Sequence, residues 1–100
     1  MKNMKNMKKV EIIIESVYIN RLLALFKKNE IKGYTIIKDI QGAGGHGRKT
    51  ADDVTDVFSN DYIFTVCEEE AFLRIQTDIT NFIKEYGGKC IVSDAMLLIW

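Results

Sequence analysis

The sequence lacks the long apolar run, the cysteine pairs and the histidine clusters that mark several functional classes. No segment approaches the about 20 apolar residues of a membrane-spanning helix, and no signal-peptide core follows the basic start. Cys67 and Cys90 have no CxxC spacing, so we expect buried free thiols in a reducing cytosol. His46 is the single histidine, and no Ser/His/Asp, Cys/His or HExxH arrangement is present. We therefore expect neither an enzyme nor a metal cofactor.

An excess of basic charge is also missing. The chain has 14 basic and 14 acidic residues, and four of the lysines lie in the first nine positions, where no acid occurs. Removing those four leaves 10 basic against 14 acidic residues, so residues 10–100 carry a net charge of −4. This acidic body argues against a nucleic-acid partner, because such proteins present a basic stripe. We expect residues 1–8 to be a disordered basic tail and residues 9–100 to be a single domain.

The hydrophobic pattern predicts one small α+β domain. With 100 residues and 47% hydrophobic content, the chain has enough apolar side chains for one core. Period-two and helical spacings predict strands at 10–15, 33–40, 61–67, 89–93 and 96–100, and helices from 19 to near 33 and from 68 to 86. This order predicts a ferredoxin-like βαββαβ sandwich with an extra C-terminal strand, and a long loop between the second and third strands.

Large apolar side chains should lie on both faces of the predicted sheet. Ile12 and Ile14 share one face, whereas Ile13 points to the other, and Ile63 likewise opposes Tyr62. The two helices of this fold cover only one face. We therefore expect an oligomer that buries the helix-free face and the apolar C-terminus.

Two glycine clusters predict an anion site. Residues 42–47 match GxGxxG, but no helical stripe follows them, and Arg48 interrupts the spacing of a P-loop. Free amides of these glycines, with Arg48 and Lys49 beside them, could still hold phosphate oxygens; a flexible connector is the alternative interpretation. Gly87-Gly88-Lys89 repeats the chemistry after the second helix, where a simple helix C-cap is the alternative.

These features resemble the PII superfamily of trimeric signalling proteins. Gly33-Tyr34-Thr35-Ile36, the loop from Gly42 to Thr50, and Gly87-Gly88-Lys89 carry the resemblance, together with the order of the elements, over about residues 9–95. The PII-like branch associated with bicarbonate and other membrane transporters is the most similar. The resemblance implies a homotrimer with an adenine-nucleotide cleft between each pair of subunits.

The resemblance also assigns residues to that cleft. Thr35 would lie near the adenine, the Gly42, Gly44 and Arg48 positions would form the base and stem of the mobile T-loop over the phosphates, and Gly88 and Lys89 would form the B-loop. Together with the loop chemistry, the predicted nucleotide site comprises Thr35, Gly42, Gly44, Arg48, Lys49, Gly87, Gly88 and Lys89.

Departures from the family pattern restrict the range of nucleotides that we expect this protein to bind. The T-loop lacks the tyrosine that some classical members modify, the B-loop is short, and the C-terminus has no arginine pair for outer phosphates. AMP, cyclic AMP or ADP is therefore expected in preference to ATP with 2-oxoglutarate. We expect a cytoplasmic regulator whose residues 42–57 control a partner, in particular a membrane transporter.

Other functions fit the same architecture. A small-molecule or metal-binding trimer of the copper-tolerance type shares it, and metal binding without nucleotide binding would favour that function. Asp52, Asp53 and Asp56 could hold a cation, although a solvated acidic flank is the simpler interpretation. An acylphosphatase-type enzyme needs an arginine-bearing loop after the first strand, and residues 15–18 contain no arginine.

Overall fold

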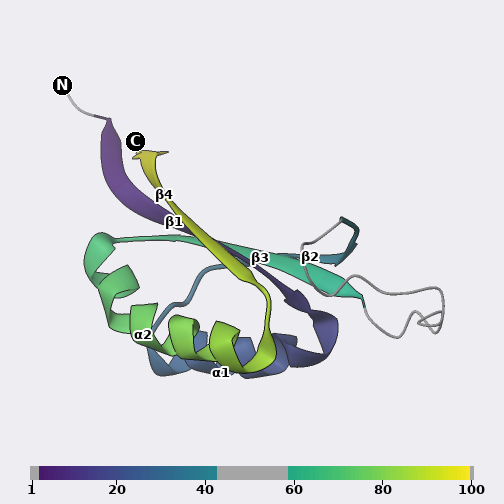
Figure 1. Ribbon diagram of the computed structural model, residues 1–100. Coiled ribbons are helices and arrows are strands. Elements are labelled where there is room, and N and C mark those ends of the chain that lie inside the picture. The colour runs from purple at the N-terminus through teal and green to yellow at the C-terminus, as the bar shows by residue number, and fades with distance from the viewer. Residues whose placement is uncertain (1–2, 43–58, 100) are drawn as a thin grey trace, which may run out of the picture.

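The fold is a four-stranded antiparallel sheet with two helices on one face (Figure 1), which confirms the predicted ferredoxin-like sandwich. The computed structural model describes residues 3–42 and 59–99. The sheet order is β2-β3-β1-β4, so β2 and β4 form its two edges. The elements are β1 (Met4–Glu15), a 3-10 turn η1 (Ser16–Tyr18), α1 (Ile19–Lys28), β2 (Thr35–Ile40), β3 (Asn60–Cys67), α2 (Glu69–Tyr86) and β4 (Lys89–Leu98).

One core lies between the sheet and the helices. Alternate residues of β1 and β3 point into it, because side chains of a strand alternate between the two faces. Each helix adds apolar residues at three- and four-residue spacing, as expected for an amphipathic helix. The buried apolar side chains are Val10, Ile12, Ile14, Ile19, Leu22, Phe26, Ile31, Ile63, Ile75, Ile79 and Phe82.

Helix α1 ends at Lys28, five residues before the predicted stop at Gly33. The Glu30 backbone has φ 63°, in the left-handed region, and its N–H donates to Lys27 O at 3.1 Å. The N–H of Ile31 donates to Phe26 O at 2.8 Å, and the Ile31 side chain is buried. This is a Schellman ending, which terminates a helix without a glycine when an apolar residue folds back onto the core.

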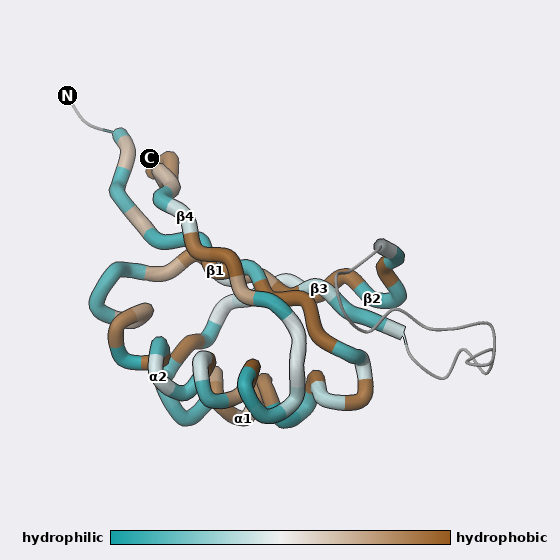
Figure 2. The backbone as a smooth tube through the Cα atoms, viewed as in Figure 1, coloured by the Kyte–Doolittle hydropathy of each residue, from teal (hydrophilic) through white to brown (hydrophobic). Residues whose placement is uncertain are grey.

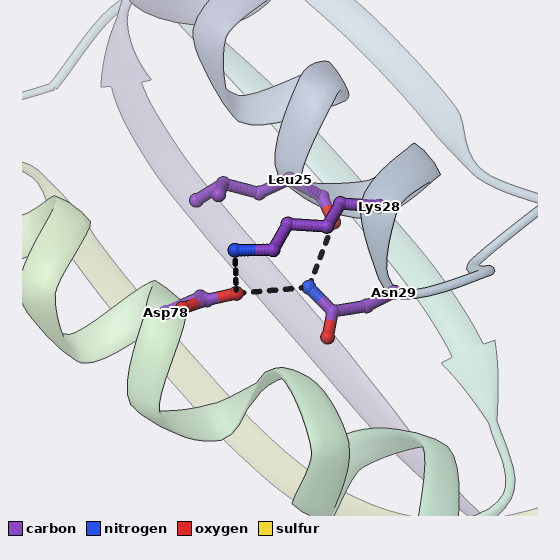
Figure 3. Close-up of polar contacts among 4 residues, drawn as sticks. All are labelled: Leu25, Lys28, Asn29 and Asp78. Atoms are coloured by element: carbon purple, nitrogen blue, oxygen red, sulfur yellow. Dashed lines mark hydrogen bonds and ion pairs between the residues drawn. The ribbon is translucent and has the colours of Figure 1, made fainter.

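A polar cluster joins the end of α1 to the middle of α2 (Figure 3). Asn29 Nδ2 donates to Leu25 O at 2.9 Å and to Asp78 Oδ2 at 3.0 Å, and Lys28 Nζ lies 3.8 Å from the same carboxylate oxygen. Arg74 Nη2 donates to Asn29 O at 3.1 Å. The cluster therefore holds the two helices together on the side away from the sheet.

The prediction of a disordered tail over residues 1–8 is wrong for residues 4–8. Met4 begins β1 and pairs with Leu98, and the ladder continues to Ile13 opposite Lys89. Lys5 Nζ lies 2.7 Å from Glu68 Oε2, and Lys8 Nζ lies 2.6 Å from Asp94 Oδ1, so acids elsewhere in the chain neutralise this basic segment. Residues 1–2 lie outside the described part of the chain.

The two predicted C-terminal strands are one. β4 runs from Lys89 to Leu98 without a break, and its second half pairs with the start of β1. Beyond the last β1–β3 pair, Lys8 with Cys67, residues 4–7 and 95–98 form a two-stranded arm. The arm projects past the helices and ends in a hydrophobic tip (Figure 2). Met96 and Leu98 are each 65% exposed.

The helix-free face of the sheet is apolar, as predicted. Tyr62 and Phe64 of β3 lie there beside Ile37 of β2, which is 51% exposed, and Ile91 of β4, which is 48% exposed. Tyr62 Oη donates to Glu11 Oε1 at 2.7 Å, so this carboxylate is hydrogen-bonded within the face.

Candidate functional site

The turn between α2 and β4 is built around two glycines with positive φ. Gly87, at φ 86°, caps α2 by donating its N–H to Ile83 O at 2.8 Å. Gly88 has φ 104°, and a Cβ on it would lie 2.6 Å from Ile13 O and 2.8 Å from Ile14 Cγ2. The C-cap interpretation is therefore confirmed for Gly87. Gly88 has a second role, because only a residue without a side chain can approach β1 this closely.

Lys89 is the first residue of β4 and is exposed. It pairs with Ile13, which places its side chain on the helix-free side of the sheet, at the outer edge. No acidic side chain in residues 3–42 or 59–99 forms an ion pair with it.

Thr35 and Gly42 lie at the opposite edge strand. Thr35 is the exposed first residue of β2 and pairs with Phe64 on the helix-free face. Gly42 follows the end of β2 by two residues, and a Cβ on it would meet nothing within 4 Å. Gly44, Arg48 and Lys49, together with His46, Asp52, Asp53 and Asp56, lie outside the described residues.

The sheet brings some of these residues to a common end but does not join them. Ile40 and Glu15 both pair with Asn60, and Ile13 pairs with Lys89, so β2 ends where β4 begins. Gly42 and the Gly87–Lys89 turn are thus at one end of the sheet. The edge strands are three strand spacings apart, about 14 Å. Thr35 and Lys89 are therefore well separated within one chain.

Neither of two open grooves in the described part of the chain contains a predicted site residue. The first, about 360 Å³, lies between α2 and the edge of β4 and is lined by Phe72, Gln76, Ile79, Thr80, Ile83, Lys84, Cys90 and Val92. The second, about 540 Å³, lies beside the arm and is lined by Asn6, Met7, Lys8, Glu69, Asp94, Ala95 and Met96.

Both cysteines are free thiols, as predicted, but they are only partly buried. Burial raises the pKa of Cys90, and it raises the pKa of Cys67 against the opposing influence of Arg74. Cys67 pairs with Lys8 and Cys90 with Ile12, on opposite sides of β1. A disulfide between them is excluded, because their Cα atoms are farther apart than the about 7 Å that such a bond spans.

Two further structural features bear on function. Within the described ranges, no three His, Cys, Asp or Glu side chains come close enough to hold a metal ion. Neither α1 nor α2 is long and apolar enough to cross a bilayer.

Comparison with known proteins identifies the family. A profile of the family described as nitrogen regulatory protein P-II matches residues 7–98. The chain belongs to the P-II family. It is a PII-like regulatory protein, as the glycine clusters and the order of its elements predict. No curated protein sequence gives a significant match.

Solved structures of PII-like proteins share the fold. The chain is similar to CPII from Thiomonas intermedia, in a structure bound to ADP and bicarbonate, with 25% identity and a TM-score of 0.78 over 94% of this chain and 90% of that one. It is also similar to a PII-like signalling protein from Thermus thermophilus, with 26% identity and a TM-score of 0.74 over 97% and 94% of the two chains.

Sequence reasoning missed one polar group at this end of the sheet. Asp61, at the start of β3, is 1% exposed although it is ionisable. In the sequence it follows several other acids of the same segment, and no spacing distinguishes it from them. Its burial is a consequence of strand register, which the sequence pattern fixes only to within a residue or two.

Proposed function

We propose that this PII-like protein is a regulator that binds an adenine nucleotide in clefts between the subunits of a homotrimer. AMP, cyclic AMP or ADP is the ligand, and residues 42–57 transmit its presence to a membrane transporter. One observation carries the proposal: the Gly87–Lys89 turn, with two positive-φ glycines and an exposed lysine that no described acid pairs with, stands at the same end of the sheet as Gly42.

The turn has the properties of a phosphate site. The N–H of Gly87 caps α2, whereas Gly88, also at positive φ, lies outside the helix, where its N–H can turn toward an anion. Lys89 adds a point charge next to it. The ADP-bound CPII structure, 25% identical over 94% of this chain, supports a nucleoside diphosphate as the class of ligand.

The proposed ligand carries one or two phosphates and not three. Beyond Lys89, residues 90–100 contain no lysine or arginine. The C-terminal segment therefore supplies no cation for the outer phosphates of a triphosphate, whose charge needs several donors. We accordingly expect a ligand with one or two phosphates.

A trimer supplies what one chain lacks. Thr35 and Lys89 lie at opposite sheet edges, and a neighbouring copy that presents its β2 edge to the Gly87–Lys89 turn would bring both onto one nucleotide. The apolar helix-free face, with Ile37 and Ile91 about half exposed, is the surface that such copies would bury. Assembly would therefore complete the cleft and cover this face in one step.

The experiment is native mass spectrometry combined with calorimetry, using AMP, ADP, ATP and cyclic AMP. We expect a trimer that binds up to three molecules of AMP, ADP or cyclic AMP, with ATP weaker. No binding of any of the four at millimolar concentration would contradict the proposal. Copper and zinc are titrated in parallel, because metal binding without nucleotide binding would favour a copper-tolerance type of protein instead.

The proposed control of a membrane transporter is tested in a separate experiment. Inner-membrane vesicles from cells that express the protein are sedimented with and without each nucleotide, and the trimer is measured in the pellet. A nucleotide-dependent change in the bound fraction is expected. A bound fraction that no nucleotide alters would contradict a membrane partner controlled by the ligand.

A further inference from the structure

A buried carboxylate joins three segments at the end of the sheet where Gly42 and Gly88 lie. Asp61 Oδ1 accepts the hydroxyl of Ser16 at 2.6 Å and the backbone N–H of Asp39 at 3.2 Å. The hydroxyl of Ser59 donates to Ser16 Oγ at 3.1 Å, and the N–H of Ser16 donates to Ser59 O at 2.7 Å. Asp61 thus joins Ser16, the residue after β1, to Asp39 near the end of β2, and Ser16 in turn is bonded to Ser59 before β3.

Asp39 occupies an irregular position in β2. Ile37 pairs with Tyr62 and Ile40 pairs with Asn60, so Lys38 and Asp39 together stand opposite Asp61. This is a β-bulge, which bends a strand and re-aims the chain that follows it. Asp39 has φ 58°, a left-handed conformation that costs energy in a residue other than glycine. Because its N–H is removed from the strand ladder, the Asp61 carboxylate is its partner.

The carboxylate is not fully satisfied. Its Oδ2 atom is buried and has no hydrogen-bond partner among the described residues. A buried carboxylate with one unpaired oxygen destabilises the fold relative to a neutral side chain of similar shape. Stability alone therefore does not account for a charge at this position, and its geometry gives it another role.

The same cluster lies next to the proposed phosphate turn. Asp61 pairs with Ile14 across the β1–β3 ladder. On the other side of β1, a Cβ on Gly88 would lie 2.8 Å from Ile14 Cγ2. Ile14 is therefore held between the carboxylate cluster and the glycine turn. A shift of β1 at this residue moves both.

We propose that Asp61 is a positioning residue for the nucleotide site. Its carboxylate fixes the β2 bulge at Asp39, and so the direction in which the chain approaches Gly42, relative to β1 and the rest of the sheet. The inference rests on the proposed function, because this positioning matters only if Gly42 of one copy and the Gly88 turn of a neighbouring copy bind one ligand. Asp61 itself does not contact the nucleotide.

The test compares three variants with the wild-type trimer. Asp61→Asn keeps the shape but removes the charge, and Ser16→Ala removes one donor. Asp78→Asn is the matched control, because it also weakens a carboxylate that bridges two elements, but on the far side of the helices (Figure 3). For each variant, calorimetry measures ADP affinity at a temperature where unfolding curves show full folding, and native mass spectrometry confirms the trimer. Hydrogen exchange reports on the Asp39 amide.

Asp61→Asn is expected to weaken ADP binding by on the order of tenfold, because charge-assisted hydrogen bonds are replaced by neutral ones. Ser16→Ala should weaken it less, and Asp78→Asn should leave it unchanged. The Asp39 amide should exchange faster in both Asp61→Asn and Ser16→Ala in the absence of nucleotide. A fast Asp39 amide together with lower affinity, in a trimer that is fully folded, supports the inference.

Two results would overturn it, and they differ from failure of the proposed function. Wild-type ADP affinity in Asp61→Asn would show that the cluster does not position the site. Unchanged exchange of Asp39 in that variant would show that the carboxylate does not hold the bulge. Absence of nucleotide binding by the wild-type protein would instead contradict the proposed function, and the positioning role with it.

Discussion

A Cβ atom on Gly88 would lie 2.6 Å from the backbone carbonyl oxygen of Ile13. The oxygen belongs to the central strand β1, and the backbone of a central strand cannot move aside without breaking its ladders to β3 and β4. The turn that begins β4 is therefore packed directly on the sheet. Its amides are held in place, which a phosphate site requires.

Substitution of Gly88 should thus damage the fold. Gly88→Ala is expected to lower the free energy of unfolding by about 2 kcal/mol or more, because it adds a backbone clash to a strained φ of 104°. Gly42→Ala is the control, since its Cβ would meet no atom within 4 Å. Urea denaturation measures both. Equal free energies of unfolding for the two variants would show that the close approach of Gly88 to Ile13 does not make alanine unfavourable at position 88.

Substitution of Lys89 should act on binding and not on stability. Lys89→Ala is expected to weaken ADP binding by on the order of tenfold, because a charge-assisted phosphate contact is lost. It should leave the unfolding midpoint within experimental error, since the side chain is exposed and forms no ion pair with a described residue. Lys27→Ala, an exposed lysine of α1, is the control. If the Lys89→Ala and Lys27→Ala variants bound ADP with the same affinity, Lys89 would not be part of the nucleotide site.

A charge on the helix-free face should prevent assembly. Ile91 is 48% exposed on that face, so Ile91→Asp has little effect on the core but places a carboxylate in the proposed contact between subunits. The variant is expected to run as a monomer in native mass spectrometry and to lose nucleotide binding. Val17→Asp, at a residue that is 74% exposed in η1, should remain a trimer. A trimeric Ile91→Asp variant would place the interface elsewhere.

The cysteines should react slowly in the folded protein. Burial raises the pKa of both Cys67 and Cys90, so at neutral pH the reactive thiolate is rarer than in an unfolded chain. The two thiols therefore also make the free energy of unfolding depend on pH. Their contribution is fully present below the pKa of the thiols in the unfolded chain, and it is lost as the pH rises through their higher pKa values in the folded protein. Labelling with an aromatic disulfide at about pH 7.5 should be at least about tenfold slower than in urea. Equal rates would show exposed thiols.

Hydrophobic periodicity predicted most of the fold, because each core-facing strand or helix carries its own pattern. Ile12 and Ile14 alternate with charged or outward residues, and Ile75, Ile79 and Phe82 recur at helical spacing, so strand and helix are distinguishable locally. The same alternation predicted that large apolar side chains lie on the helix-free face. These are local properties that need no knowledge of the partner strand.

The N-terminal arm could not be predicted, because its order depends on distant residues. Residues 4–7 have no apolar period of their own, and they are ordered by β4 and by the pair between Lys5 and Glu68. The predicted end of α1 was wrong for a related reason. Ile31 folds back onto the core and ends the helix, and a glycine further along the chain is a weaker signal than that contact.

The candidate site was predicted by residue type but not by arrangement. Glycines next to lysine indicate anion binding in any sequence, so Gly87, Gly88 and Lys89 could be named in advance. That Gly88 contacts Ile13, and that Asp61 holds the bulge at Asp39, depends on strand register. Register is set by all four strands together and cannot be derived from one segment.

The most direct measurement is the mass of the assembly in the presence of ADP. The account predicts a particle of three chains that takes up to three ADP molecules, with uptake lost in the Ile91→Asp monomer. A wild-type protein that remains a single chain, or a trimer that takes up no adenine nucleotide, would contradict it.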